Sequence, residues 1–159
     1  MSKAPGNYVT KIPDNLSSAD AAPMLCAGIT TYAALRKCQA KSGQWVVISG
    51  AGGGLGHIAC QLAAHGMAMR VIGIDHGSKE KVVRDSGAEA FVDITKYDDE
   101  SIAKEVIRIT GGQGASAVIV CTASNKAYDQ SLDFLRFGGT MVCVGIVLLT
   151  AIENTTRPF

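Results

Sequence analysis

From residue 45 onward, short runs of β-branched and other apolar residues alternate with longer amphipathic segments. The short runs predict five strands, at residues 45–49, 70–75, 91–93, 117–121 and 140–145. The longer segments predict helices at residues 55–65, 79–86, 98–110 and 126–137. Strands that are apolar along most of their length and separated by single helices are typical of a parallel sheet covered on both faces. We therefore predict a doubly wound α/β domain with right-handed crossovers.

Residues that favour helix ends flank several of these segments. Gly87 follows the second predicted helix and Gly111 follows the third, where a glycine commonly ends the helix. Asp98 or Asp99 can cap the third helix, and Ser124 can cap the fourth. These positions support the predicted alternation of strand and helix.

The first 44 residues lack the strand pattern of the rest. A helix start is predicted near Ser17, and residues 19–38 predict one or two helices with breaks near Pro23 and Gly28. We interpret this part as a helical lead-in to the sheet.

Length and charge exclude several classes of function. A chain of 159 residues suits one domain with a substantial core. Its 15 Lys and Arg residues nearly balance 14 Asp and Glu residues and form no basic cluster, which argues against nucleic-acid binding. The longest apolar run, residues 141–152, is shorter than the ~20 residues of a membrane-spanning helix. The first ten residues also lack the apolar stretch of a secretory signal. We expect neither nucleic acid nor a membrane as a partner.

The five cysteines are widely spaced and form no CxxC pair. An odd number in this arrangement argues against a disulfide framework and against a closed structural zinc site within the chain. We therefore expect reduced thiols and a cytoplasmic location. Four of the cysteines are interpreted as small core residues: Cys38, Cys60, Cys121 and Cys143.

The first predicted strand runs directly into a glycine-rich segment, Gly50-Ala51-Gly52-Gly53-Gly54-Leu55-Gly56, which opens the first predicted helix. The pattern A-x-G-x-x-G falls on Ala51, Gly53 and Gly56. Position 51 makes the tight turn, Gly53 lets the backbone approach a pyrophosphate, and Gly56 lets the helix pack closely on the strand. The helix N-terminus supplies free N–H groups and the positive end of the helix dipole.

An acidic residue completes this pattern. Asp75 ends the second predicted strand, 19 residues after Gly56. A carboxylate at this distance accepts hydrogen bonds from the adenosine ribose and repels a 2′-phosphate, so it selects NAD over NADP.

Two other enzyme classes share part of this signal. The short-chain dehydrogenase loop also fits residues 49–56, but that class needs a Tyr-x-x-x-Lys pair. Tyr32, Tyr97 and Tyr128 are followed four residues later by Arg, Ser and Leu, so none supplies the lysine. Methyltransferases also combine a glycine-rich loop with an acidic residue at a strand end. They are disfavoured here by loop length and by the resemblance described next.

Three segments together resemble the zinc-dependent, medium-chain alcohol dehydrogenases, most closely their fungal, yeast-like branch. These segments are PMLCAGITTY at residues 23–32, SGAGGGLGHIACQLA at 49–63 and VIGID at 71–75, and the resemblance covers residues 12–146. It implies a Rossmann fold with five of the usual six strands. It also divides the chain into a lead-in (1–44) from a missing catalytic domain, an NAD-binding domain (45–146) and a non-family C-terminal tail (147–159).

The resemblance also implies roles for individual residues. Cys26 matches the third catalytic zinc ligand, which acts only with the missing domain, and no catalytic residue lies within this chain. Thr30 matches a residue beside the nicotinamide, and Lys79 a basic residue near the adenosine ribose. The residues implied to bind coenzyme are Thr30, Gly50, Ala51, Gly52, Gly53, Gly54, Leu55, Gly56, Asp75, Lys79, Cys121, Thr122, Val144, Gly145 and Ile146.

The resemblance implies that the full-length parent oxidises a small alcohol to an aldehyde or ketone with NAD, assisted by zinc. We expect this chain to bind NAD(H) but to have no dehydrogenase turnover alone. Two alternatives stay open: a zinc-free quinone or enoyl reductase of the same superfamily, which usually prefers NADPH and lacks the acid at position 75, and a non-catalytic dinucleotide-binding module. The apolar edge of strand 140–145 can pair with the tail or with a second copy, so a homo-oligomer is also considered.

Overall fold

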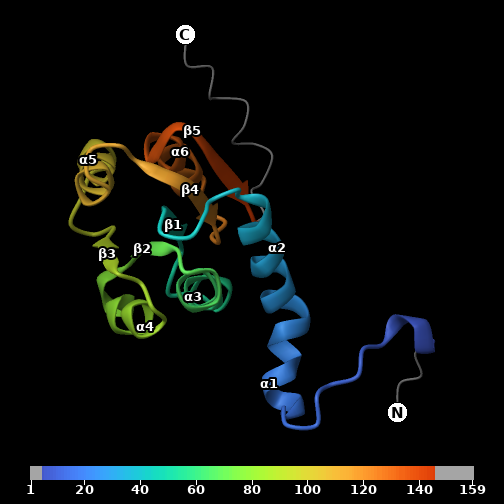
Figure 1. The fold of residues 1–159 in the computed structure, drawn as a ribbon. Helices are drawn as coiled ribbons and strands as arrows, with labels where there is room; N and C mark the ends of the chain where they lie inside the picture. The colour runs from blue at the N-terminus through green and yellow to red at the C-terminus, as the bar shows by residue number, and fades with distance from the viewer. Residues whose placement is uncertain (1–4, 146–159) are drawn as a thin grey trace.

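The structure, a computed structural model, describes residues 5–145 of the chain (Figure 1). Five parallel strands form one sheet in the order β3-β2-β1-β4-β5. Their bounds are β1 Trp45–Ser49, β2 Arg70–Asp75, β3 Ala90–Asp93, β4 Ala115–Val120 and β5 Leu135–Cys143. This arrangement confirms the predicted doubly wound parallel sheet.

Helices cover both faces of the sheet: α3 and α4 lie on one side in Figure 1, and α5 and α6 on the other. The helices are α3 Gly54–Gln61, continued by a π-helical turn Leu62–Gly66, α4 Glu80–Asp85, preceded by a 3-10 turn Gly77–Lys79, α5 Asp99–Ile109 and α6 Asn125–Asp133. The predicted caps are present. The Asp98 side chain accepts from the Ser101 amide in a capping box, and Ser124 accepts from the Ala127 amide.

The side chains of the strands alternate between two cores. In β1, Val46 and Ile48 pack into the core on the α2 and α3 side, whereas Val47 packs into the core on the α5 and α6 side. All three are fully buried. Burying one such side chain contributes roughly 1.5–3 kcal/mol, so apolar strands covered on both faces hold the sheet together.

The prediction for the last helix and strand was wrong at their boundary. The helix predicted at 126–137 ends at Asp133. The strand predicted at 140–145 is β5, which begins five residues earlier than predicted, at Leu135, and ends at Cys143. Phe134 is buried at this junction, and its carbonyl accepts from the Ala115 amide, which starts the pairing with β4 early. A register irregularity in this pairing follows, where Gly138 has a φ of +72°.

The N-terminal lead-in is helical, as predicted. After a 3-10 turn Gly6–Tyr8 it forms α1 Ser18–Pro23, a π-helical turn Met24–Gly28 and α2 Ile29–Lys37, so the expected breaks appear as a change of helix type. Figure 1 shows α1 extending away from the sheet while α2 approaches it. No helix within residues 5–145 has both the length and the apolar character needed to cross a bilayer.

The cysteine prediction is confirmed in part. Cys38 and Cys60 are buried and Cys121 is half-buried, but Cys143 is exposed because it is the last residue of β5, at the open end of an edge strand of the described sheet. Burial raises the pKa of the Cys60 and Cys121 thiols to about 12. All five cysteines are free thiols.

Candidate functional site

The glycine-rich turn joins β1 to α3 at the carboxyl end of the sheet. Gly50 has a φ of +76°, a left-handed conformation that glycine adopts without strain. The amides of Gly50 and Ala51 both donate to the Ile74 carbonyl, at 2.9 and 3.1 Å. Because Ile74 lies in β2, these bonds fix the turn against the neighbouring strand.

Gly56 brings α3 into direct contact with this turn. A Cβ added at Gly56 would lie 2.0 Å from the Gly50 carbonyl oxygen and 2.7 Å from the Ala51 Cα. The residue before α3, Gly53, has no side chain to cap the helix, so the first amides of α3 can receive a ligand. Free amides at a helix N-terminus are suited to an anion, as the glycine-rich pattern predicted.

Asp75 lies directly beside the glycine-rich turn. Its Oδ2 accepts from the Gly52 amide at 2.8 Å, and its Oδ1 accepts from the His76 amide at 2.7 Å. Lys79 is next to the same glycine, because a Cβ added at Gly52 would lie 2.6 Å from the Lys79 Cβ. The acid and the lysine expected at the ribose are therefore brought together with the turn.

A cavity of about 190 Å³, here called the crevice cavity, opens beside this turn. It lies between β1 and β4, where the strand order changes direction and where ligands bind in open α/β sheets. Its lining residues come from the ends of four strands or from the helices that follow them: Ser49, Gly50, Ile74, Asp75, Ile94, Ile102, Thr122, Ser124, Lys126, Ala127 and Gln130. The lining combines three isoleucines with polar residues such as Asp75, Thr122 and Lys126.

Sequence reasoning missed several of these lining residues. Ile94 directly follows the predicted strand 91–93 and Lys126 opens a predicted helix, so their places after strand ends were the available signal. Asp99 of α5 contacts both Lys126, at 2.7 Å, and the side-chain amide of Gln130, also at 2.7 Å. These contacts connect α5 and α6 beside the cavity.

Thr122 lies between the ends of β1 and β5. A Cβ added at Gly50 would lie 3.2 Å from the Thr122 Cβ, and one added at Gly145 would lie 2.1 Å from the Thr122 carbonyl oxygen. The Val144 and Gly145 amides each donate to the Val120 carbonyl at 3.0 Å. The structure thus brings these predicted residues to the same edge as the turn, whereas Ile146 lies outside the described residues.

The Tyr128 hydroxyl of α6 donates to the Gly145 carbonyl at 2.6 Å. This contact, which the sequence did not predict, fixes the end of β5. Burial is the main cause that raises the pKa of Tyr128 above its ordinary value, so the hydroxyl stays protonated and remains a donor at neutral pH.

Cys26 and Thr30 lie apart from the crevice cavity. Cys26 is exposed in the π-helical turn and lines a second cavity of about 670 Å³, between that turn and α3, with Gly54 and Leu55. Thr30 is exposed on α2 and lines neither cavity. Within residues 5–145 no three His, Cys, Asp or Glu side chains come together as a metal site. Cys26 supplies one thiol there, fewer than the three protein ligands of a catalytic zinc site.

Comparison with known proteins finds relatives whose sequences are similar to most of this chain. The chain is 65% identical over 147 residues to alcohol dehydrogenase 2 of Emericella nidulans, covering 89% of this chain and 40% of the relative. It is 42% identical over 144 residues to an alcohol dehydrogenase of Schizosaccharomyces pombe, covering 90% of this chain and 40% of the relative. The chain thus spans about two fifths of the length of these relatives.

Solved structures share the fold. An alcohol dehydrogenase from Thermotoga maritima has a TM-score of 0.80 at 26% identity, covering 94% of this chain and 40% of that one. A mycobacterial protein solved in complex with NADPH also has a TM-score of 0.80, at 30% identity, covering 98% of this chain and 51% of that one.

The family model described as zinc-binding dehydrogenase matches residues 54–158, about two thirds of the chain. The matched range includes most of residues 147–159, which the resemblance had left outside the family and which lie outside the described structure. It also includes α3, Asp75 and the strands β2, β3 and β4 beside the crevice cavity, whereas β1 lies before it. The expected resemblance to the medium-chain alcohol dehydrogenases is confirmed, and the chain belongs to the zinc-binding dehydrogenase family.

Proposed function

We propose that this chain is the NAD-binding part of an alcohol dehydrogenase that converts a small alcohol to an aldehyde or ketone. The observation that carries the proposal is the 2.8 Å contact between the Asp75 carboxylate and the Gly52 amide. This contact joins a phosphate-binding turn and a ribose-binding acid in one site, beside a cavity that can receive a flat base. The domain division at residues 44 and 146 is part of the proposal.

Each group of the site has a separate task in binding. The amides at the N-terminus of α3 bind the pyrophosphate, and Asp75 accepts hydrogen bonds from the ribose hydroxyls. The apolar walls at Ile94 and Ile102 enclose the adenine. When bound, NAD accepts a hydride, and the residues of this chain orient it by holding its adenosine half.

The remaining parts of the proposal concern the longer protein. Cys26 would be one of three zinc ligands there, and zinc would act as a Lewis acid on the alcohol oxygen. One thiol does not make a zinc site, so we derive no step through zinc and expect no turnover from this chain alone. The five free thiols support a reducing, cytoplasmic location, and the edge position of β5 in the described sheet supports pairing with a second copy in a homo-oligomer.

Titration of the chain with NAD and with NADP, each with and without zinc, tests the proposal. We expect NAD to bind at least roughly tenfold more tightly than NADP, a difference of about 1.4 kcal/mol, because Asp75 repels a 2′-phosphate. Added zinc should not change either affinity. Asp75→Asn should reduce the preference, whereas Asp85→Asn, which removes an exposed carboxylate paired with Lys81 on α4, should retain it.

The same titration separates the second candidate function. A zinc-free NADPH-dependent reductase is favoured by the mycobacterial neighbour solved with NADPH and by a neighbour described as a quinone oxidoreductase from Pseudomonas syringae. Tighter binding of NADP than of NAD would support that function and contradict ours. If the chain binds neither NAD nor NADP, both candidate functions are contradicted.

A further inference from the structure

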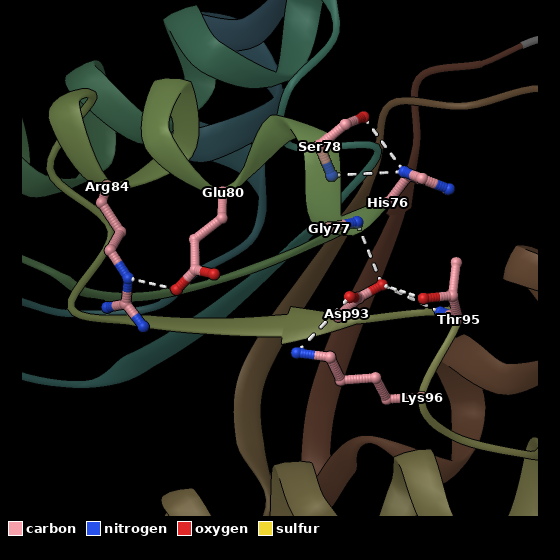
Figure 2. Close-up of polar contacts among 8 residues, drawn as sticks. All are labelled: His76, Gly77, Ser78, Glu80, Arg84, Asp93, Thr95 and Lys96. Atoms are coloured by element: carbon pink, nitrogen blue, oxygen red, sulfur yellow. Dashed lines mark hydrogen bonds and ion pairs between the residues drawn. The ribbon is translucent and has the colours of Figure 1, made fainter.

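Asp93, the last residue of β3, is a nearly buried carboxylate that none of the proposed binding roles uses. Asp93 is 8% exposed, and it is not among the residues that line the crevice cavity. Figure 2 shows its side chain between the turn that follows β2 and the segment that follows β3. A buried charge requires partners, so its contacts indicate what it holds in place.

Three hydrogen bonds converge on one oxygen of this carboxylate (Figure 2). Asp93 Oδ1 accepts from the Gly77 amide at 3.0 Å, from the Thr95 amide at 3.0 Å and from the Thr95 hydroxyl at 2.8 Å. Lys96 Nζ lies 3.7 Å from Oδ2. Hydrogen bonds from Thr95, first from its amide, lower the pKa of Asp93, so the group is ionised at neutral pH.

The amide that Asp93 holds belongs to the turn directly after Asp75. Asp75 and Asp93 are paired in the sheet, and the Asp75 carbonyl accepts from the Ile94 amide at 3.0 Å. The turn continues to Lys79, whose amide donates to the His76 carbonyl at 2.8 Å. Asp75, the Gly77 amide and Lys79 are therefore linked through one short segment.

Gly77 fits closely against the carboxylate. A Cβ added at Gly77 would lie 2.3 Å from Asp93 Oδ2. Only a residue without a side chain therefore fits at this position beside the carboxylate. Figure 2 also shows Glu80 and Arg84, which pair with each other on α4 at 2.7 Å and contact neither Asp93 nor Gly77. The Gly77 amide is thus held by Asp93, whereas the His76 ring holds the neighbouring Ser78 amide in the same turn.

A free backbone N–H in the turn after the ribose-binding acid can donate a charge-assisted hydrogen bond to a 2′-phosphate. In this chain the Gly77 N–H already donates to Asp93. We propose that Asp93 is a positioning residue for coenzyme selectivity, which withholds the Gly77 amide from a 2′-phosphate and fixes the turn that carries Asp75 and Lys79. This inference rests on the proposed function and deepens it.

The test compares the ratio of the NADP and NAD dissociation constants in the unmodified chain and in Asp93→Ala. Releasing the Gly77 amide should narrow this ratio roughly fivefold, the usual effect of one hydrogen bond. Asp93→Asn retains an acceptor oxygen in nearly the same shape and should keep the ratio within roughly twofold of the unmodified chain. Narrowing as large in Asp93→Asn as in Asp93→Ala would overturn the proposed role of the hydrogen bond.

Thr110→Val is the matched control. Thr110 is also 8% exposed, and its hydroxyl accepts from the Gly114 amide at 2.9 Å, but it follows α5 at the opposite end of the sheet. Its loss should lower stability without changing the ratio. Were the ratio to narrow equally in Thr110→Val, the effect of Asp93 would be general destabilisation, and the inference would fail.

If Asp93→Ala does not fold, Thr95→Val is the milder variant, since it deletes only the hydroxyl that donates to Asp93. The Gly77 amide still donates to Asp93 in this variant, but the carboxylate loses one of the donors that fix its position. The ratio should therefore narrow in the same direction by a smaller factor, and an unchanged ratio would count against the inference. Failure of the inference can be told from failure of the proposed function. A chain that prefers NAD but keeps its ratio in Asp93→Ala contradicts only the inference, whereas a chain that binds no dinucleotide contradicts both.

Discussion

Replacing Gly56 by alanine should destabilise the folded chain strongly. The new Cβ would lie 2.0 Å from the Gly50 carbonyl oxygen, 2.7 Å from the Ala51 Cα and 2.8 Å from the Ala51 carbonyl carbon. All three are backbone atoms, so no side chain can rotate away, and α3 must move outward by more than roughly 1 Å to restore ordinary contact. Overpacking of this kind costs about 1–3 kcal/mol, and we expect a value near 3 kcal/mol.

Gly54→Ala provides a control in the same helix. Nothing lies within 4 Å of a Cβ added at Gly54, the first residue of α3. Alanine at a helical position that it can adopt without strain stabilises by about 0.4–1 kcal/mol, chiefly by restricting the unfolded chain. Two glycine-to-alanine changes only two residues apart should therefore have opposite signs.

Urea unfolding without nucleotide measures both effects. The single tryptophan, Trp45, lies in β1, so its fluorescence reports on the strand that precedes the turn, and far-ultraviolet circular dichroism reports on the helices. For Gly56→Ala a loss near 3 kcal/mol corresponds to a melting temperature lowered by roughly 6–12 °C in a chain of this size. A Gly56→Ala variant within about 0.5 kcal/mol of the unmodified chain, or a Gly54→Ala variant that is equally unstable, would refute the packing argument.

Three further outcomes follow from the contacts and pKa directions. Tyr128→Phe removes the donor to the Gly145 carbonyl and should lower the free energy of unfolding by about 1 kcal/mol, which an unchanged urea midpoint would contradict. At pH 8, iodoacetamide should modify the exposed thiols of Cys26 and Cys143 in the folded chain. It should spare three thiols whose pKa values are raised by burial until urea unfolds the chain, as read by peptide mass spectrometry: Cys38, Cys60 and Cys121. Hydrogen bonds lower the pKa of five carboxyl groups below their ordinary values of 3.8 for Asp and 4.5 for Glu: Glu89, Asp93, Asp98, Asp99 and Glu105. The stability they contribute is complete above those ordinary values and is lost as the pH falls through the lower folded-state values, so the urea midpoint should be level near neutrality and fall in acid.

The local sequence pattern predicted the bounds of some helices and strands to the residue and the bounds of others poorly. The strands β1 and β2 have the predicted bounds because each is a short apolar run between polar or glycine residues. The helix predicted at 126–137 was too long, because Phe134 continues the amphipathic pattern while its carbonyl already pairs with β4. That boundary depends on a strand far away in sequence, which no local pattern contains.

Some residues of the candidate site were likewise predictable from the sequence, and others were not. Asp75 and the glycine-rich turn were predicted together, because the interval between them is a property of one strand–helix–strand unit. Ile102 and Gln130 line the same cavity but come from α5 and α6, whose placement depends on the order of the strands. Their contribution becomes visible only in three dimensions.

The residues that line the crevice cavity also explain how such a domain can diverge. Ile48 and Ile72 lie within strands and are fully buried, whereas Asp75, Ile94 and Thr122 stand at strand ends or just beyond them. Substitutions at the second group change what the crevice recognises while leaving the packing of the first group intact. Over evolution, a lineage of this architecture can acquire a new ligand preference through changes in a handful of loop positions, without losing its ability to fold.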